Sequence, residues 1–256
     1  PFRAWSLVLH HQSEYSLANA YNLGLMSILA YSTHSENDLG SVQELFFQQF
    51  QDLSRTPRVW DNGQAWPCLV TDVAFSERYV TAKSLDTSKA EPQEGDTQLF
   101  YAINSTQVLV AWRGTEMNGF ADLRTDSTFR PVKPEVAALC ESELPCLDLV
   151  PKGGVHLGFR DAFEVARRVF TKDLGETITR EIEGKELFIC GHSLGGALGL
   201  IHAASLKQLK PLLYTYGMPR TFTLKAMESL SDLWHFRHVN DSDAIPRVPP
   251  EAALDN

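Results

Sequence analysis

The sequence predicts an α/β fold in which a mostly parallel central sheet carries helices on both faces. Strand-like and helix-like segments alternate between residues 186 and 239, an order that is typical of parallel sheets. The chain has 256 residues, of which 43% are hydrophobic, and this is enough to bury a sizeable core. We therefore expect one α/β domain over residues 1–256.

The N-terminal part, residues 1–60, is predicted to be helical and to pack on this domain. A second amphipathic helix is expected over residues 41–53, because Ser41 and Glu44 have the spacing of a capping box. The first helix is indicated by apolar residues that recur every three or four positions, as on the inner face of a helix: Leu17, Ala20, Tyr21, Gly24, Leu25, Ile28 and Leu29.

The middle of the chain predicts a β-hairpin followed by a long insert. Residues 98–103 and 107–112 are strand-like, and the three residues between them suit a turn. Residues 116–150 are largely polar and show no helical or strand periodicity. Because loops of this length in a compact domain are usually functional, we expect residues 116–150 to form a mobile lid or insert.

The second half of the chain supplies most of the predicted sheet. A helix is expected from Phe159 to about Ile182, and Gly184 should end it. The elements expected after it are a strand at 186–190, a helix at 195–207, a strand at 212–216, a helix at 223–231 and a strand at 233–239.

Composition excludes several functional classes. The chain has 23 Lys and Arg against 32 Asp and Glu, a net charge of −9, which is the wrong sign for binding nucleic-acid phosphates. Its longest apolar stretches are about half of the roughly 20 residues that span a bilayer. No two cysteines have the Cys-x-x-Cys spacing of zinc or redox sites. Cys140 and Cys146 leave two alternatives open, a short disulfide or two free thiols.

The most informative motif is Gly-His-Ser-Leu-Gly at residues 191–195. An apolar strand leads into it and an Ala- and Leu-rich helix leaves it, which is the setting of a nucleophile elbow. Side chains in place of Gly191 and Gly195 would collide in such a turn. The hydroxyl of Ser193 would stand near the positive end of the helix, where an oxyanion is favoured. A glycine-rich turn without a catalytic role is the alternative interpretation.

Four further segments accompany this motif in a characteristic order. They are Ala-Trp-Arg-Gly-Thr at 111–115, Val-His-Leu-Gly-Phe at 155–159, Tyr-Gly-Met-Pro-Arg at 216–220 and the Asp-Ala-Ile-Pro region at 239–250. Together they resemble the class 3 (fungal-type) lipases of the α/β hydrolase fold, over about residues 98–250. The chain departs from the family at Met218, where a small or polar residue is usual. It also resembles, more weakly, the bacterial type VI secretion lipase effectors.

The resemblance assigns a role to each candidate site residue. It makes Ser193 the nucleophile and Asp243 the acid of the triad, with Asp241 as the rival carboxylate. The oxyanion hole would consist of Leu194, through its backbone N–H, and Thr115. The family's lid follows Thr115, in agreement with the insert expected at residues 116–150. The implied reaction is hydrolysis of carboxylic esters of phospholipids or glycerides through an acyl-enzyme, which needs no metal or cofactor.

The general base is the gap in this assignment. In α/β hydrolases the catalytic His follows the acid along the chain, yet residues 244–256 contain no His. We therefore expect the base to lie C-terminal to Asn256 and this chain alone to be nearly inactive. The resemblance interprets His156 and His192 as structural residues.

Two other functions stay open at this point: a carboxylesterase that acts on soluble esters, and a catalytically incomplete hydrolase fold that serves as a binding module. The expected partners are a lipid ester substrate, a membrane surface contacted peripherally, and an inhibitor or immunity protein. The first residues carry no signal-peptide pattern, so a mature product or an excised domain is expected. Such a protein would be secreted or delivered to a target cell.

Overall fold

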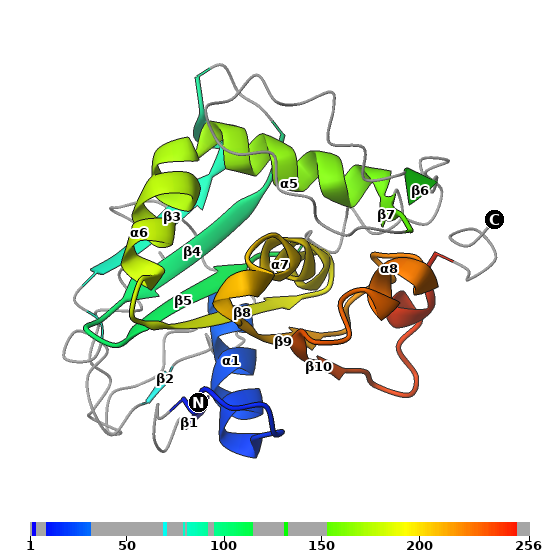
Figure 1. The fold of residues 1–256 in the computed structure, drawn as a ribbon, viewed down its shortest axis with the longest axis horizontal. Helices are drawn as coiled ribbons and strands as arrows, with labels where there is room; N and C mark the ends of the chain where they lie inside the picture. The colour runs from blue at the N-terminus through cyan, green and yellow to red at the C-terminus, as the bar shows by residue number, and fades with distance from the viewer. Residues whose placement is uncertain are drawn as a thin grey trace, which may run out of the picture.

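The computed structural model describes residues 2–3, 9–31, 69–70, 79, 81–91, 95–114, 131–132 and 153–249. Within them the centre is a six-stranded sheet in the order β10-β9-β8-β5-β4-β3 (Figure 1). Strands β10, β9, β8 and β5 are parallel, and β4 and β3 continue the sheet as antiparallel strands. The bounds are β3 Thr81–Asp86, β4 Gln98–Ile103, β5 Gln107–Trp112, β8 Glu186–His192, β9 Leu212–Tyr216 and β10 Trp234–His238.

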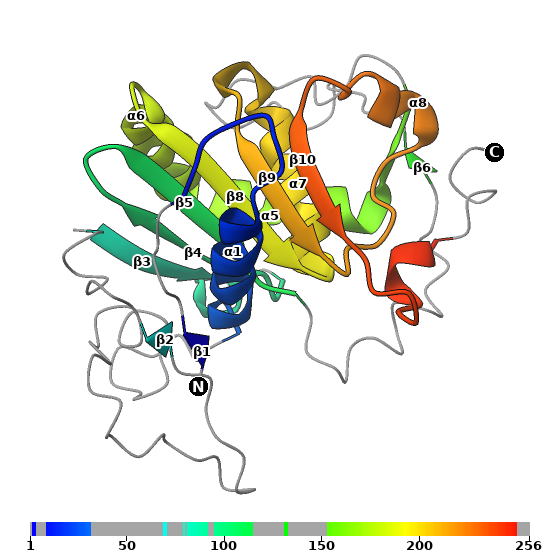
Figure 2. The same cartoon turned by 90° about the horizontal axis from the view of Figure 1, so that it is seen from below.

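Helices cover both faces of this sheet. Helix α1 (Leu17–Leu29) packs on β8 and β9 from one side, and α7 (Leu194–Ser205) packs on the same strands from the other, with α5 (Leu157–Val169) against α7 (Figure 2). The predicted fold class, a mostly parallel sheet between helices, is therefore confirmed. The shorter helices are α6 (Ile178–Ile182) and α8 (Leu224–Glu228). No helix among the described residues is long and apolar enough to cross a membrane.

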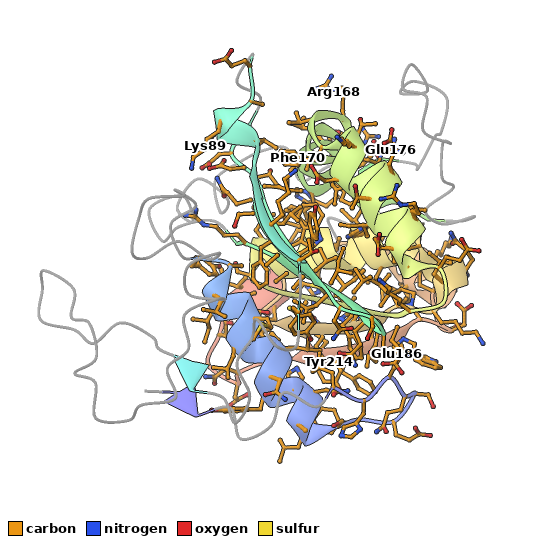
Figure 3. All side chains as sticks on the ribbon, turned by 90° about the vertical axis from the view of Figure 1, so that its left-hand side faces the viewer. Lys89, Arg168, Phe170, Glu176, Glu186 and Tyr214 are labelled. Atoms are coloured by element: carbon orange, nitrogen blue, oxygen red, sulfur yellow. The ribbon has the colours of Figure 1, made fainter. Side chains whose placement is uncertain are left out.

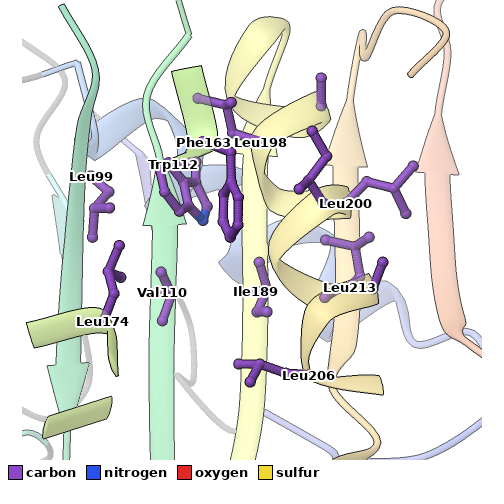
Figure 4. Packing of buried hydrophobic residues seen from close by; sticks show 14 of the residues in the cluster. Leu99, Val110, Trp112, Phe163, Leu174, Ile189, Leu198, Leu200, Leu206 and Leu213 are labelled. Carbon is purple, nitrogen blue, oxygen red and sulfur yellow. The ribbon is translucent and has the colours of Figure 1, made fainter. Parts of the chain in front are cut away.

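The central strand β8 shows why the sheet forms here. Its apolar run is buried on both faces, as expected of a strand inside a parallel sheet. Leu187 and Ile189 join the core beneath α7 and α5, whereas Phe188 and Cys190 join the core beneath α1. Figure 4 shows the first of these cores, in which Ile189 and its neighbours fill the space between the strands and α7. The strand is thus clamped between two apolar layers up to the start of the Gly-His-Ser-Leu-Gly turn.

Two pairs of very short strands lie outside the main sheet. Strands β1 (Phe2–Arg3) and β2 (Leu69–Val70) pair in parallel, and β6 (Pro131–Val132) pairs antiparallel with β7 (Val155–His156). Strand β6 is the described part of the predicted lid; the rest of residues 116–150 lies outside the described residues. The helix predicted at 41–53 and the Cys140–Cys146 pair also lie outside them.

The predicted helix from Phe159 to Ile182 is wrong in being continuous. Helix α5 ends at Val169, and Phe170, labelled in Figure 3, leaves the helical conformation with φ −106° and ψ 37°. A π-helical turn, Thr171–Thr177, separates it from α6. This turn carries Asp173 to the sheet, where its carboxylate accepts hydrogen bonds from the Tyr101 hydroxyl (2.8 Å) and the Lys83 ammonium (2.9 Å).

The inner face predicted for helix α1 is also partly wrong. Leu17 is 75% exposed, and Tyr21 and Ile28 are exposed as well. Buried polar residues occupy part of the inner face of the helix in place of the predicted apolar residues. They can be buried there because they form hydrogen bonds with nearby groups. The Asn19 side chain exchanges two hydrogen bonds with the backbone of His10 (2.8 and 2.7 Å), and the Ser27 hydroxyl donates to the carbonyl of Leu23. The helix is therefore rotated from the orientation that its apolar residues indicate.

Candidate active site

The turn between β8 and α7 holds Ser193 in a strained conformation. Its φ of 57° and ψ of −128° are unfavourable for an L-residue and persist only where the surroundings impose them. The backbone N–H of Ser193 donates to the carbonyl of Tyr216 (2.8 Å), and its carbonyl accepts from Gly196 N–H (2.9 Å). The side chain is 2% exposed, and its Oγ makes no hydrogen bond within the described residues. The hydroxyl is therefore held in place and left available for chemistry.

The two glycines of the motif allow three backbone segments to meet. A Cβ on Gly191 would overlap the backbone of Gly195 and lie 2.7 Å from the nitrogen of Gly196. A Cβ on Gly195 would overlap the carbonyl of Trp112, at the end of β5. Only glycine permits this approach. The ends of β5 and β8 and the start of α7 thus converge at the serine.

The loop after β5 lies directly against the turn that carries Ser193. A Cβ on Gly114 would lie 3.2 Å from the Cβ of Ser193 and 2.6 Å from the carbonyl oxygen of His192. Leu194, on the other side of the serine, is the first residue of α7, where backbone N–H groups lack helical partners. Thr115, the second oxyanion residue predicted, lies outside the described residues. The geometry brings the loop that carries it to the serine.

Asp243 lies in the loop after β10, beside the end of β9. Its Oδ1 accepts a hydrogen bond from the N–H of Ile245 (2.9 Å), and its own N–H donates to the carbonyl of Asn240 (3.0 Å). A Cβ on Gly217 would lie 2.9 Å from its Oδ2. Because β9 is the neighbour of β8, this carboxylate reaches the edge of the sheet where Ser193 stands. Asp241, in the same loop, is exposed.

The imidazole of His192 lies between Tyr31 and Gly217 and makes no hydrogen bond with the serine hydroxyl. Its Nδ1 is 2.9 Å from the hydroxyl of Tyr31, and its Nε2 would lie 3.6 Å from a Cβ on Gly217. Burial lowers the pKa of His192, and the charge of Asp243 opposes that effect only in part. A neutral imidazole at neutral pH follows.

Four other described histidines are engaged elsewhere. His156 caps α5 by accepting from the N–H of Phe159 (3.4 Å), and His202 accepts from the indole N–H of Trp112 (3.2 Å) in the core. His235 bonds to the hydroxyl of Thr215, and His238 to the hydroxyl of Tyr15. Within the described residues, no imidazole is hydrogen-bonded to Ser193. His34 lies outside them.

Two arginines that carried no predicted role hold the Asp243 loop. The guanidinium of Arg237 donates to the carbonyls of Met218 (2.8 Å) and Pro246 (2.9 Å). The guanidinium of Arg220 donates to the carbonyls of Arg247 (2.9 Å) and Pro249 (3.0 Å). Arg220 belongs to the Tyr-Gly-Met-Pro-Arg segment, but the sequence does not reveal the role of either arginine, because the partners are backbone carbonyls that any residue supplies.

The described residues contain no group of three or more His, Cys, Asp or Glu side chains that could hold a metal ion. The groups gathered at the turn are instead a hydroxyl, a carboxylate and backbone N–H donors. Such groups serve nucleophilic substitution at a carbonyl carbon.

Comparison with known proteins identifies a matching family and several related proteins. The family model Lipase (class 3) matches residues 109–253, which include the turn, the Gly114 loop and Asp243. Toxin TseL of Vibrio cholerae is 28% identical over 96% of this chain, and a secreted mono- and diacylglycerol lipase, MDL3 of Malassezia globosa, is 30% identical over 61% of it. The chain spans 42% of the first protein and 53% of the second.

A solved structure gives the same indication for the fold. A mutant form of MDLA from Penicillium cyclopium superposes with a TM-score of 0.55 over 94% of this chain and 78% of its own, at 18% identity. The resemblance drawn from the sequence motifs is thus confirmed, and the fold is that of the α/β hydrolase lipases. The family model covers more than half of the chain, which therefore belongs to the class 3 lipases.

Proposed function

We propose that this chain carries the nucleophile, acid and oxyanion loop of a serine lipase or phospholipase that hydrolyses carboxylic esters of lipids through an acyl-enzyme. The observation that carries the proposal is the turn at Ser193. Its φ of 57° and its buried Oγ, which makes no hydrogen bond within the described residues, suit a nucleophile held ready for attack. The class 3 lipase family of the chain supports lipid esters as the substrate class.

The proposed reaction has two halves. Ser193 Oγ attacks the ester carbonyl carbon while its proton passes to an imidazole base, and the carbonyl oxygen becomes an oxyanion facing the N–H of Leu194 and Thr115. The tetrahedral intermediate collapses, and the alcohol leaves with the proton from the imidazolium. Water, deprotonated by the same base, then attacks the acyl-enzyme and releases the fatty acid and the serine. Each oxyanion donor contributes about 3 to 4 kcal/mol to lowering the barrier.

Asp243 is the proposed acid partner of the base, in preference to Asp241. The loop that carries it is held by the guanidinium groups of Arg220 and Arg237, and one oxygen is fixed by the N–H of Ile245. Asp241 is exposed. A carboxylate oriented in this way stabilises the imidazolium that forms during attack.

The base itself is proposed to lie outside the described residues. The seven described histidines are not hydrogen-bonded to Ser193, and the chain order of α/β hydrolases favours a position after Asp243. We retain the sequence-based expectation that it lies beyond Asn256.

We also propose a lid formed by residues 116–150 and peripheral contact with a membrane surface. The insert follows the Gly114 loop directly, so its covering of Ser193 would gate access of lipid. The similarity to a Vibrio cholerae toxin favours delivery to a target cell and an immunity protein as partner. The similarity to a secreted mono- and diacylglycerol lipase favours glycerides beside phospholipids as substrates.

Active-site labelling of the full-length protein tests the nucleophile. We expect a fluorophosphonate to modify Ser193, and Ser193→Ala to abolish labelling and to lower turnover of phospholipid vesicles and diacylglycerol emulsions by as much as about 10⁶-fold. Ser231→Ala, at an exposed position after α8, is the matched control and should retain both. Labelling of another serine with Ser193 unmodified contradicts the proposal. Hydrolysis of soluble esters alone, with no rise above the micellar concentration, favours a carboxylesterase.

A further inference from the structure

Tyr31 lies between the two loops that meet at the nucleophile. It follows the end of α1, and its backbone N–H donates to the carbonyl of Ile28 (3.0 Å). On one side its hydroxyl is 2.9 Å from Nδ1 of His192, the residue next to Ser193. The tyrosine is therefore bonded to the nucleophile turn by a contact that spans 161 residues of sequence.

On its other side the same hydroxyl occupies the space against the loop after β5. A Cβ on Gly114 would overlap the Tyr31 hydroxyl, so the backbone of this loop passes immediately beside it. The backbone of Gly114 and the charge of Arg113 both lower the pKa of the Tyr31 phenol, and the Arg113 guanidinium carbon lies 5.8 Å from the centre of the tyrosine ring. One hydroxyl thus contacts both the loop that leads to Thr115 and the turn that carries Ser193 and Leu194.

The position of Tyr31 is fixed by the helix that precedes it. Helix α1 packs on β8 and β9, the hydroxyl of Tyr216 on β9 donates to the carbonyl of Ala20, and a Cβ on Gly24 would lie 3.4 Å from the Tyr216 ring. The fully buried Ala30 connects the helix to Tyr31. The tyrosine therefore follows a helix that packs on the same two strands that support the nucleophile turn.

The phenol of Tyr31 stays protonated at neutral pH. Burial raises its pKa to about 12, although Arg113 and the backbone of Gly114 oppose that rise. The hydroxyl therefore forms its 2.9 Å hydrogen bond with Nδ1 of His192 in the neutral state, and the imidazole tautomer determines which of the two groups donates.

We propose that Tyr31 is a positioning residue for acyl transfer: its hydroxyl fixes the distance between the Gly114 loop and the nucleophile turn, so that oxyanion donors on both converge. This inference rests on the proposed serine mechanism. An oxyanion hole works only when its donors lie about 2.7 to 3.1 Å from the oxygen that becomes charged. A shift of about 1 Å between the two loops can cost up to about 100-fold in rate.

The test is Tyr31→Phe in the full-length protein, which removes the hydroxyl and keeps the ring. We expect kcat and the second-order rate of fluorophosphonate labelling to fall together by about 10- to 100-fold, with KM nearly unchanged. Tyr15→Phe is the matched control, because it removes another hydroxyl–imidazole hydrogen bond (Tyr15 to His238, 3.2 Å) away from the turn. It should leave both rates at the wild-type value.

A second variant distinguishes positioning from loss of folding. His192→Phe removes the other partner of the same hydrogen bond. The double variant Tyr31→Phe/His192→Phe should therefore be no less active than the less active of the two single variants. Thermal unfolding must show that each variant is as fully folded as the wild-type protein at the assay temperature. Wild-type labelling rates in Tyr31→Phe, with Ser193 still labelled, overturn the positioning role alone. Absence of any Ser193 labelling in the wild-type protein overturns the serine mechanism itself.

Discussion

At the scale of single residues, His202 links burial to the pH dependence of stability. It lies in the core between Trp112 and Phe163, and burial lowers its pKa from 6.5 to about 4. Between these two values the unfolded chain binds a proton that the folded chain does not. The stability that the neutral imidazole maintains is therefore present above about pH 6.5 and is lost as the pH falls toward 4.

This difference predicts the behaviour of His202→Asn, which keeps an acceptor for the Trp112 indole. From pH 7 to pH 5, His202 should lower the free energy of unfolding of the wild-type chain by about 2 kcal/mol. The variant should lose about 2 kcal/mol less over the same interval, although its stability at pH 7 is lower because of the smaller side chain. Urea unfolding at the two pH values measures this. Parallel losses in the two proteins would show that His202 is protonated in the folded state.

Residues of the site differ in how far the sequence reveals them. The turn at Ser193 is encoded locally, since an apolar strand, two glycines and a helix follow one another within about 20 residues. Tyr31 and Arg237 act through partners on distant segments or through backbone carbonyls, and neither leaves a pattern in the sequence. Chemistry that depends on neighbours along the chain was therefore predictable, whereas support that depends on the packed fold was not.

At the scale of elements, the π-helical turn between α5 and α6 explains a wrong prediction. The sequence predicted one helix from Phe159 to about Ile182, but the turn Thr171–Thr177 places Asp173 under the sheet. There the Tyr101 hydroxyl donates to it, and its charge raises the pKa of Tyr101 further than burial alone. At this point the hydrogen bond from the buried Tyr101 hydroxyl to a charged acceptor stabilises the chain more than a continuous regular helix would.

Removing that acceptor should therefore destabilise the chain. We expect Asp173→Ala to lower the free energy of unfolding by about 2 kcal/mol, because it leaves the Tyr101 hydroxyl buried without a partner. Adding Tyr101→Phe removes the unpaired hydroxyl and should recover part of the loss. Denaturant unfolding of the two variants checks both expectations. A double variant that is less stable than Asp173→Ala would show that the hydroxyl has another acceptor.

The other elements show which signals were sufficient. The hairpin β4–β5 and the strands β8, β9 and β10 appear where strand-like runs predicted them. Strand β3 was not predicted, because it is an edge strand whose buried residues, Ala82 and Leu85, face different cores and do not alternate. The rotation of α1 likewise follows from hydrogen bonds to buried polar side chains, which apolar spacing does not report.

At the scale of the whole molecule, the proposal that the base lies beyond Asn256 predicts the activity of residues 1–256 alone. We expect hydrolysis of short-chain nitrophenyl esters close to background, since a site without its base retains roughly 10³- to 10⁴-fold over water from the oxyanion hole and binding. Full-length protein, assayed beside it, should be far more active. Lipase-like rates from residues 1–256 that disappear in His34→Ala would place the base in the N-terminal part.

The pairing of β5 with β8 also determines when the site at Ser193 can form as the chain folds. Gln107 and Glu186, opposite one another on these strands, are 79 residues apart, and Tyr216 reaches back 196 residues to Ala20. Contacts of this range form late, because long loops must close before they bring any stabilisation. During synthesis, at about 5 to 20 residues per second, the turn at Ser193 has no neighbouring strand β9 until the ribosome has passed residue 216. The packed conformation of this turn is therefore expected only in chains whose synthesis has passed that residue.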